Sequence, residues 1–208
     1  ASVGRHALMP PLVPGRLRGA RHSEQKGAFC VTPLQLTPQW TGSILDVGGG
    51  GEGIIGRLYG QQVIAIDNCQ EELDEAPDGF QKIWMDACHM TFPAEQFNHV
   101  TFFYSLMYLD RESQKKALQE AYRVLKPGGQ LHLWDAEIEK AYPEPFVVEL
   151  DIQLPTEEIH TGYGVVSDVV NQTAQSVAAL CMDAGFQLLS SQTAEGQFYL
   201  ACSKNAGL

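Results

Sequence analysis

The sequence predicts one α/β domain of three layers, in which a seven-stranded, mostly parallel sheet ends in an antiparallel hairpin. Two observations lead to this prediction. Short apolar runs alternate with segments of helical spacing between residues 43 and 134, which is the order of parallel strands joined by helical crossovers. Near the C-terminus, two apolar runs are joined by a tight turn at 194–196, and strands joined so closely must be antiparallel.

The parallel part of the sheet is predicted first along the chain. Strands are expected at the short apolar runs of residues 43–47, 62–66, 81–85, 100–104 and 131–134. Helices are expected at 53–59 and 111–125, with room for only a short one between residues 71 and 77. The helix at 111–125 places Ala117, Leu118 and Ala121 on one face, and the Lys-Pro-Gly-Gly turn at 126–129 should end it.

The last third of the sequence has a different pattern. Residues 146–154 and 161–166 are rich in β-forming residues, so an added hairpin or cover is expected within a β-rich insertion around 146–166. Asp168 is expected to cap a helix that buries Val169 and Val177 and ends near Gly185. The strands predicted at 186–190 and 197–202 then form the antiparallel hairpin.

Composition limits the kind of protein. A chain of 208 residues with 44% hydrophobic residues suits one globular domain. The net charge of −11 disfavours nucleic acid as a partner, and no apolar run reaches the roughly 18 residues that span a membrane. The cysteines are scattered without a CxxC pair, so neither a disulfide framework nor a metal site is expected and a reducing cytoplasm is the simpler location. They are Cys30, Cys69, Cys88, Cys181 and Cys202.

The first 26 residues differ from the rest. They hold five basic residues against one acidic residue, several prolines and glycines, and no hydrophobic period. We expect residues 1–26 to be a flexible basic leader, although a nucleic-acid-binding arm has the same composition, and residues 27–208 to form the domain.

Residues 44–53, with the sequence ILDVGGGGEG, carry the strongest local motif. Glycines between a strand and a helix let the backbone approach a ligand closely. Gly48, Gly50 and Gly53 fit the dinucleotide-binding pattern, and Asp67 lies 19 residues after Gly48, where that pattern places a ribose-binding acid. The pattern alone is compatible with a nicotinamide-dependent oxidoreductase, and Asp67 could instead cap the helix that follows.

Three further segments separate these alternatives: 84–87 (WMDA), 92–100 (FPAEQFNHV) and 123–131 (RVLKPGGQL). Together with residues 44–53, they resemble the small-molecule branch of the class I, Rossmann-like methyltransferases that use S-adenosylmethionine. The resemblance runs from about Ile44 to Asp135, and the predicted hairpin extends it to Cys202. The Leu-Lys-Pro-Gly-Gly string is the most specific part, and an oxidoreductase has no particular need of it.

The resemblance implies transfer of a methyl group from S-adenosylmethionine to an unidentified small molecule. It implies that Asp46 meets the amino-acid end of the cofactor, Asp67 its ribose and Asp86 its adenine. The full set of expected cofactor-binding residues is Asp46, Gly48, Gly49, Gly50, Asp67, Asn68, Asp86, Ala87 and Phe103. The sequence departs from the family at Glu52, which stands where the third glycine of the motif belongs. The alternatives are a non-catalytic, methyltransferase-like binding domain and a nicotinamide-dependent oxidoreductase.

Catalytic residues are less evident. Tyr104 and Asp135 follow the fourth and fifth predicted strands, where ligands bind in open α/β sheets, so they are the candidates; Ser105, Tyr108 and Glu137 lie close by. Tyr104 fits a core aromatic equally well. His89 is more typical of a solvated loop, and His132 of a strand interior.

The β-rich stretch at 146–166 offers polar groups that could cover an acceptor. A cover of this kind would exclude water and leave a pocket sized for a small molecule. Alternatively, this stretch packs against the domain or forms a dimer contact. The groups concerned are Glu149, Asp151, Gln153, His160 and Tyr163.

Overall fold

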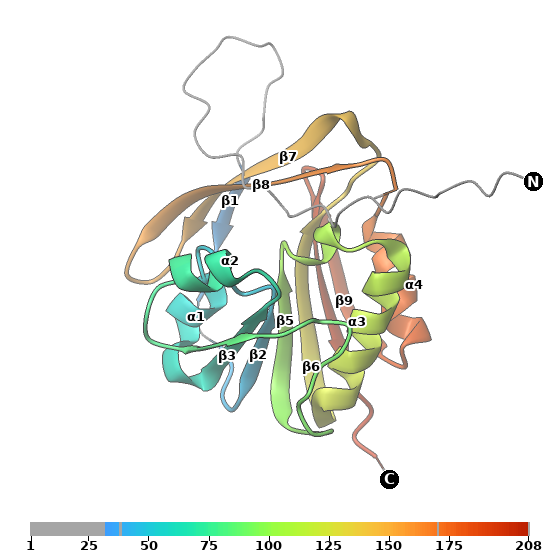
Figure 1. Ribbon diagram of the computed structural model, residues 1–208. Helices are drawn as coiled ribbons and strands as arrows, with labels where there is room; N and C mark the ends of the chain where they lie inside the picture. Colours follow the sequence, from blue (N-terminus) through green and yellow to red (C-terminus); the bar gives the residue numbers. More distant parts are fainter. Residues whose placement is uncertain (1–31, 38, 170, 208) are drawn as a thin grey trace, which may run out of the picture.

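The computed structural model describes residues 32–37, 39–169 and 171–207 (Figure 1). The predicted basic leader at 1–26 and Cys30 lie outside the described residues. Within the described part, no helix is long and apolar enough to cross a membrane.

The main sheet has the predicted architecture. Its seven strands lie in the order β4-β3-β2-β5-β6-β10-β9. The first five pair in parallel, whereas β10 is antiparallel to both β6 and β9. The bounds are β2 (Ile44–Val47), β3 (Val63–Asp67), β4 (Gln81–Trp84), β5 (Phe97–Phe103), β6 (Leu125–Ala136), β9 (Gln187–Ala194) and β10 (Gln197–Ser203).

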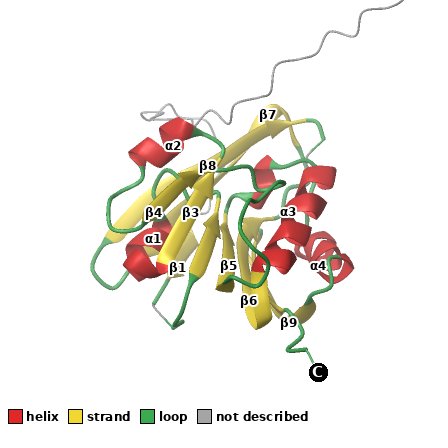
Figure 2. Cartoon of the chain, turned by 60° about the horizontal axis from the view of Figure 1, so that its bottom comes forward, coloured by secondary structure: helices red, strands yellow, loops and turns green. Residues whose placement is uncertain are grey.

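The two faces of this sheet are buried against different elements. Leu45, Phe102 and Leu133 point to the face that packs on α3 (Arg111–Val124) and α4 (Ala174–Asp183). These two helices lie side by side (Figure 2). Their neighbours Ile44, Phe103 and Trp134 point to the opposite face, which packs on α1 (Ile54–Tyr59). Because successive residues of a strand face opposite ways, strands buried on both faces show continuous apolar runs.

A second sheet of three strands crosses the end of the main sheet (Figure 1). Its order is β1 (Thr32–Gln35), β7 (Ala141–Gln153) and β8 (Glu158–Ser167). The antiparallel pair β7–β8 is the hairpin expected within residues 146–166, extended at both ends. The sequence analysis missed β1, which pairs in parallel with β7 more than a hundred residues later, as in Leu34 with Ile152.

The predicted start of α4 is wrong. Strand β8 continues to Ser167, and Val169 is 68% exposed rather than buried on the helix. The helix begins at Ala174 behind Thr173, whose hydroxyl accepts the Ser176 amide at 3.1 Å while the Ser176 hydroxyl accepts the Thr173 amide at 3.0 Å. This reciprocal capping box satisfies two amides, so it defines the helix start better than Asp168 does.

The end of α3 also differs slightly from the prediction. The helix stops at Val124, and Leu125 is already extended because it pairs with Phe97 of β5. The Lys-Pro-Gly-Gly segment at 126–129 therefore lies inside β6 rather than between helix and strand. The short helix α2 (Gln70–Glu75) lies close to residues 71–77, where only a short helix was expected.

Candidate functional site

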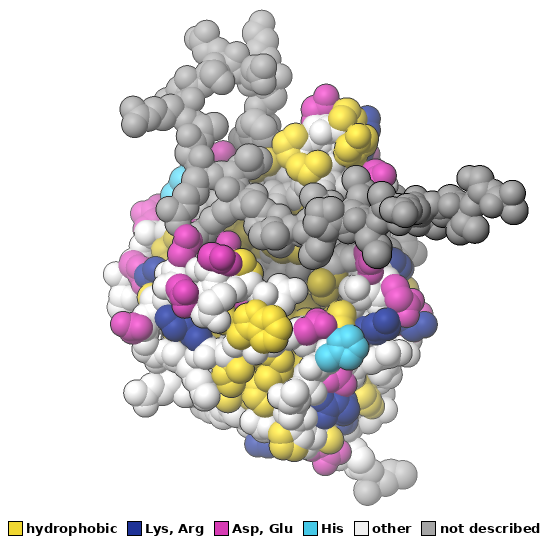
Figure 3. All heavy atoms as spheres, in the orientation of Figure 1, with side chains coloured by type: hydrophobic (Ala, Val, Ile, Leu, Met, Phe, Trp, Pro, Cys, Tyr) yellow, Lys and Arg dark blue, Asp and Glu magenta, His cyan; other side chains and the backbone are white. Residues whose placement is uncertain are grey.

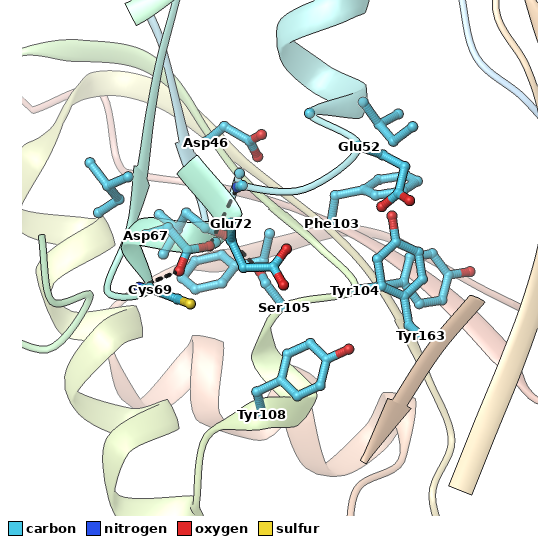
Figure 4. A pocket seen from close by; sticks show the side chains of 18 of the residues that line it. Asp46, Glu52, Asp67, Cys69, Glu72, Phe103, Tyr104, Ser105, Tyr108 and Tyr163 are labelled. Atoms are coloured by element: carbon cyan, nitrogen blue, oxygen red, sulfur yellow. Dashed lines mark hydrogen bonds between the residues drawn. The ribbon is translucent and has the colours of Figure 1, made fainter. Parts of the chain in front are cut away.

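A cavity of about 720 Å³ lies at the carboxyl ends of β2, β3 and β5, beneath the β7–β8 hairpin (Figure 4). Open α/β sheets bind their ligands at this end. All nine residues expected to bind a cofactor line the cavity, and so does Tyr104. The sequence analysis placed these residues on four separate segments, and the fold brings them to one surface. Glu52, Glu72 and Tyr108 line it as well.

The glycine turn after β2 is tightly packed. Gly48 has a φ of 73°, and a Cβ atom there would lie 2.4 Å from the Cβ atom of Ser105. A Cβ atom on Gly49 would lie 2.4 Å from Oδ2 of Asp46. Both contacts are too short for any side chain, so the turn needs glycine at these positions to keep the backbone beside Asp46.

Asp46 is buried at the floor of the cavity, with 2% of its surface exposed. Its Oδ1 accepts a hydrogen bond of 2.7 Å from the Thr101 hydroxyl. Burial raises the pKa of Asp46 to about 7; the Thr101 hydrogen bond opposes this rise and the charge of Asp67 adds to it. A cationic ligand group beside Asp46 would favour its ionised form.

Asp67 ends β3 and bridges two turns. Its Oδ1 accepts the Cys69 amide at 2.9 Å, and its Oδ2 accepts the Gly50 amide at 3.4 Å. Burial raises the pKa of Asp67 despite these hydrogen bonds. The carboxylate thus holds the turn before α2 and still lines the cavity, so the capping and ligand-binding interpretations are compatible. The carbonyl of Asn68 accepts the Trp84 indole N–H at 3.0 Å, which ties this turn to β4.

Asp86 follows β4 and is oriented by its neighbours. Its Oδ1 accepts a hydrogen bond of 2.9 Å from the Cys88 amide. Its Oδ2 lies 2.9 Å from Nδ1 of His89. Partial burial alone would raise the pKa of Asp86, but the hydrogen bonds from His89 and Cys88 outweigh it and the pKa is lowered. The exposed His89 therefore lies beside the carboxylate, and the adjacent Ala87 lines the cavity.

Tyr104 forms part of the cavity wall and of the core at once. It has a φ of 49°, unusual for a bulky residue, and only 2% of its surface is exposed. Its hydroxyl donates to Oε1 of Gln197 on β10, and its ring lies parallel to that of Tyr163 on β8. Burial, followed by the charge of Asp135, raises the pKa of Tyr104, so the phenol stays protonated at neutral pH.

Asp135 does not line the cavity. It is fully buried and accepts hydrogen bonds from the Met107 amide at 3.1 Å, the Ala136 amide at 2.8 Å and the Gln172 side chain at 2.7 Å. Burial raises the pKa of Asp135 to about 7 against the effect of these bonds. Gln172 also accepts from Gln114 at 3.0 Å. This network holds the segment after β5, which carries Tyr108, in place.

Other polar candidates have structural contacts. The Glu137 carboxylate accepts the Ala174 amide at 3.3 Å, at the start of α4. His132 is buried, with its Nδ1 2.9 Å from the Tyr199 hydroxyl and Trp40 stacked on its ring. The sequence analysis did not find Gln114, Gln172 or Gln197. No local pattern marks them, because their partners come from distant segments.

The hairpin forms the outer wall of the cavity. Of the five polar residues expected there, Glu149, His160 and Tyr163 line it. Asp151 is 2.6 Å from Nδ1 of His160, and this hydrogen bond raises the pKa of the histidine. Gln153 pairs with Gln35 of β1 and is not part of the lining. Among the described residues, no group of three or more His, Cys, Asp or Glu side chains could hold a metal ion.

The glycine turn, the carboxylates that follow β2, β3 and β4, and the antiparallel seventh strand together define the class I, Rossmann-like methyltransferase fold. Residues 45–133 match the family model of a methyltransferase domain. The chain therefore has the fold of the class I methyltransferases, whose methyl donor is S-adenosylmethionine, and residues 45–133 are similar to their methyltransferase domain.

Solved structures share this fold. An S-adenosylmethionine-dependent methyltransferase from Methanosarcina mazei has a TM-score of 0.60 and 18% identity, with 82% of this chain and 95% of that chain covered. The glycopeptide N-methyltransferase MtfA, complexed with S-adenosylmethionine, has a TM-score of 0.55 and 16% identity, with 81% and 89% covered. The [4+2]-cyclase SpnF has a TM-score of 0.57 and 17% identity, with 80% and 77% covered. A search of curated proteins finds no match.

Proposed function

We propose that this protein transfers the methyl group of S-adenosylmethionine to a small-molecule acceptor. The observation that carries the proposal is one cavity that holds both the complete set of expected cofactor-binding residues and an aromatic wall. The similarity to the cyclase SpnF shows that the fold alone does not define the reaction. The assignment to methyl transfer therefore rests on the site and on the match to a methyltransferase domain.

The cavity suits an extended cofactor whose parts are recognised by successive strands. We propose that Asp46, with the turn at Gly48, Gly49 and Gly50, holds the amino-acid end. Asp67 and Asn68 would hold the ribose hydroxyls, and Asp86 with the Ala87 amide the adenine. Phe103 lies beside them in the lining. When bound, S-adenosylmethionine supplies a methyl group on a cationic sulfur, which a nucleophile displaces in line.

The hairpin wall supports a small acceptor. The volume of about 720 Å³ is within the usual range for small-molecule pockets, and β7 and β8 cover the open edge of the cavity. The net charge of −11 disfavours a polynucleotide. Tyr104 would contact the acceptor through its ring, whereas Asp135 would act as a positioning residue through Met107 and Gln172.

The proposal also includes the bounds of the domain and its cellular location. Residues 27–208 would form the domain, with the β-rich stretch at 146–166 as its insertion. A cytoplasmic location would suit Cys69, Cys88, Cys181 and Cys202, which are free cysteines.

Calorimetry with S-adenosylhomocysteine tests the cofactor assignment. The Asp67→Ala variant should lose roughly 1.5–3 kcal/mol of binding free energy, because hydrogen bonds to a charged group disappear. Asp78→Ala is the matched control, since the Asp78 side chain is fully solvent-exposed and lies outside the lining. Tight binding of a nicotinamide dinucleotide, or equal affinities in the two variants, would contradict the assignment.

A further inference from the structure

The acceptor end of the cavity combines carboxylates with aromatic rings. Figure 4 shows the Glu52 carboxylate pointing toward Tyr104 and Tyr163. Glu149 lines the same cavity from β7, and Tyr108 lines it from the segment after β5. Glu52 stands where the related glycine motif has no side chain, so this carboxylate is an addition to the motif.

The charges of the lining are one-sided. Among the residues that the structure describes, no Lys or Arg lines the cavity. Six carboxylates do: Asp46, Glu52, Asp67, Glu72, Asp86 and Glu149. Figure 3 shows acidic side chains over α1 and α2, with Lys and Arg side chains among them. The pKa of His160 is raised by its hydrogen bond with Asp151, but that carboxylate, 2.6 Å away, offsets the positive charge.

The carboxylates divide into two groups. Asp46, Asp67 and Asp86 lie at the positions proposed for the cofactor. The Glu72 side chain lies beside the glycine turn, since a Cβ atom on Gly50 would lie 2.6 Å from the Cβ atom of Glu72. Glu52 points toward the tyrosines, and Glu149 pairs with Gly162, next to Tyr163. Two half-buried carboxylates in a partly enclosed space attract a cation and repel a carboxylate or phosphate. The faces of tyrosine rings attract cations as well.

We propose that the acceptor is a basic amine on an apolar or aromatic body, and that Glu52 and Glu149 select it. This inference rests on the proposed function and adds the substrate class. The amine binds as its ammonium form and loses one proton to a carboxylate or to solvent. The freed nitrogen lone pair then forms a bond to the methyl carbon, and the carbon–sulfur bond breaks with its electron pair on sulfur. The products are the methylated ammonium ion and S-adenosylhomocysteine.

A panel of matched acceptors tests the inference. Phenyl- and indolyl-ethylamines would be compared with the alcohols and carboxylates built on the same rings, all with S-adenosylmethionine, by release of S-adenosylhomocysteine and by mass of the product. We expect methylation on nitrogen, with kcat/KM for amines at least about tenfold above that for the alcohols. Better turnover of an alcohol or carboxylate, or no turnover of any amine, would overturn the inference.

Variants that remove one carboxylate charge test whether Glu52 and Glu149 select the amine. Glu52→Gln and Glu149→Gln should each raise KM for the best amine by about tenfold, because one charged hydrogen bond is lost. Glu158→Gln is the matched control, since Glu158 lies on the same hairpin but is exposed and outside the lining. Equal KM values in all three variants would contradict the roles of Glu52 and Glu149.

Binding of S-adenosylhomocysteine distinguishes a failure of the proposed function from a failure of the proposed substrate class. If S-adenosylhomocysteine does not bind the unmodified protein, the proposed function itself fails. If it binds and an acceptor other than an amine is methylated, only the substrate class is wrong.

Discussion

The rings of Tyr104 and Tyr163 are stacked, with centroids 5.2 Å apart and planes within 8° of parallel. Tyr104 follows the central strand β5, and Tyr163 lies on β8 of the hairpin. This pair joins the main sheet to its cover at the edge of the cavity. Phe103 adds an edge-on contact to Tyr163, with centroids 6.3 Å apart.

Removal of the Tyr163 ring should weaken acceptor binding and spare the cofactor. We expect Tyr163→Ala to raise acceptor KM by about threefold to tenfold, as expected for loss of an aromatic contact, with unchanged affinity for S-adenosylhomocysteine. Tyr163→Phe keeps the stack and should change KM less. Tyr142→Ala, an exposed tyrosine on β7, serves as the control. If Tyr163→Ala has the same KM as this control, the stack is not part of the acceptor site.

Cofactor affinity should depend on pH through Asp46. Burial raises its pKa to about 7, so a fall in pH below this value removes the negative charge that we propose pairs with the ammonium group of the ligand. We expect the affinity for S-adenosylhomocysteine to fall as pH drops below 7, by up to about tenfold per pH unit, and to level off above it. Calorimetry should show uptake of a proton by the buffer on binding at pH 6. Asp46→Asn should bind weakly with no such dependence; retention of the dependence would assign it to another group.

Stability of the ligand-free protein should show the opposite trend. Burial raises the pKa of Asp135 from 3.8 in the unfolded chain to about 7, so the folded state keeps a proton that the unfolded state loses. The contribution of this group to the free energy of unfolding is thus complete below pH 4 and falls as pH rises to about 7. Urea unfolding at several pH values measures it. Asp135→Asn should flatten the slope between these limits, and an unchanged slope would contradict the raised pKa.

The start of α4 gives a stability prediction with an internal control. Thr173→Ala removes the side-chain cap and should lower the free energy of unfolding by about 1 kcal/mol. Asp168→Ala changes a residue that caps no helix, and we expect a change within about 0.5 kcal/mol. Thermal and urea unfolding of both variants would check this. A larger loss for Asp168→Ala than for Thr173→Ala would contradict the position of the helix start.

Local patterns in the sequence were sufficient to predict the main sheet and the glycines and carboxylates that line the cavity. Strands such as β2 and β3 are apolar because both faces of the sheet are covered, and Asp46 and Asp67 are recognisable because each ends such a strand. The glycine turn is recognisable for a similar reason, since close contacts at Gly48 and Gly49 leave no room for a side chain. These features appear in the sequence as local patterns, an apolar run, an acid at its end and successive glycines, although some of the contacts behind them, such as Gly48 with Ser105, come from distant segments.

Contacts between distant segments decided the remainder. Asp135 follows β6 as expected, yet the amides of Met107 and Ala136 and the side chain of Gln172 draw its carboxylate into the core instead of the cavity. Strand β1 exists because β7 offers it a free edge, and Glu52 points toward the tyrosines because β8 crosses the end of the sheet. The position of each of these groups depends on which surfaces meet after folding. The contacts that fix it come from segments far apart in the sequence, so they form only in the folded protein. The sequence therefore determined the class of fold and the strand ends that line the cavity, whereas the tertiary structure decided which other polar groups face it.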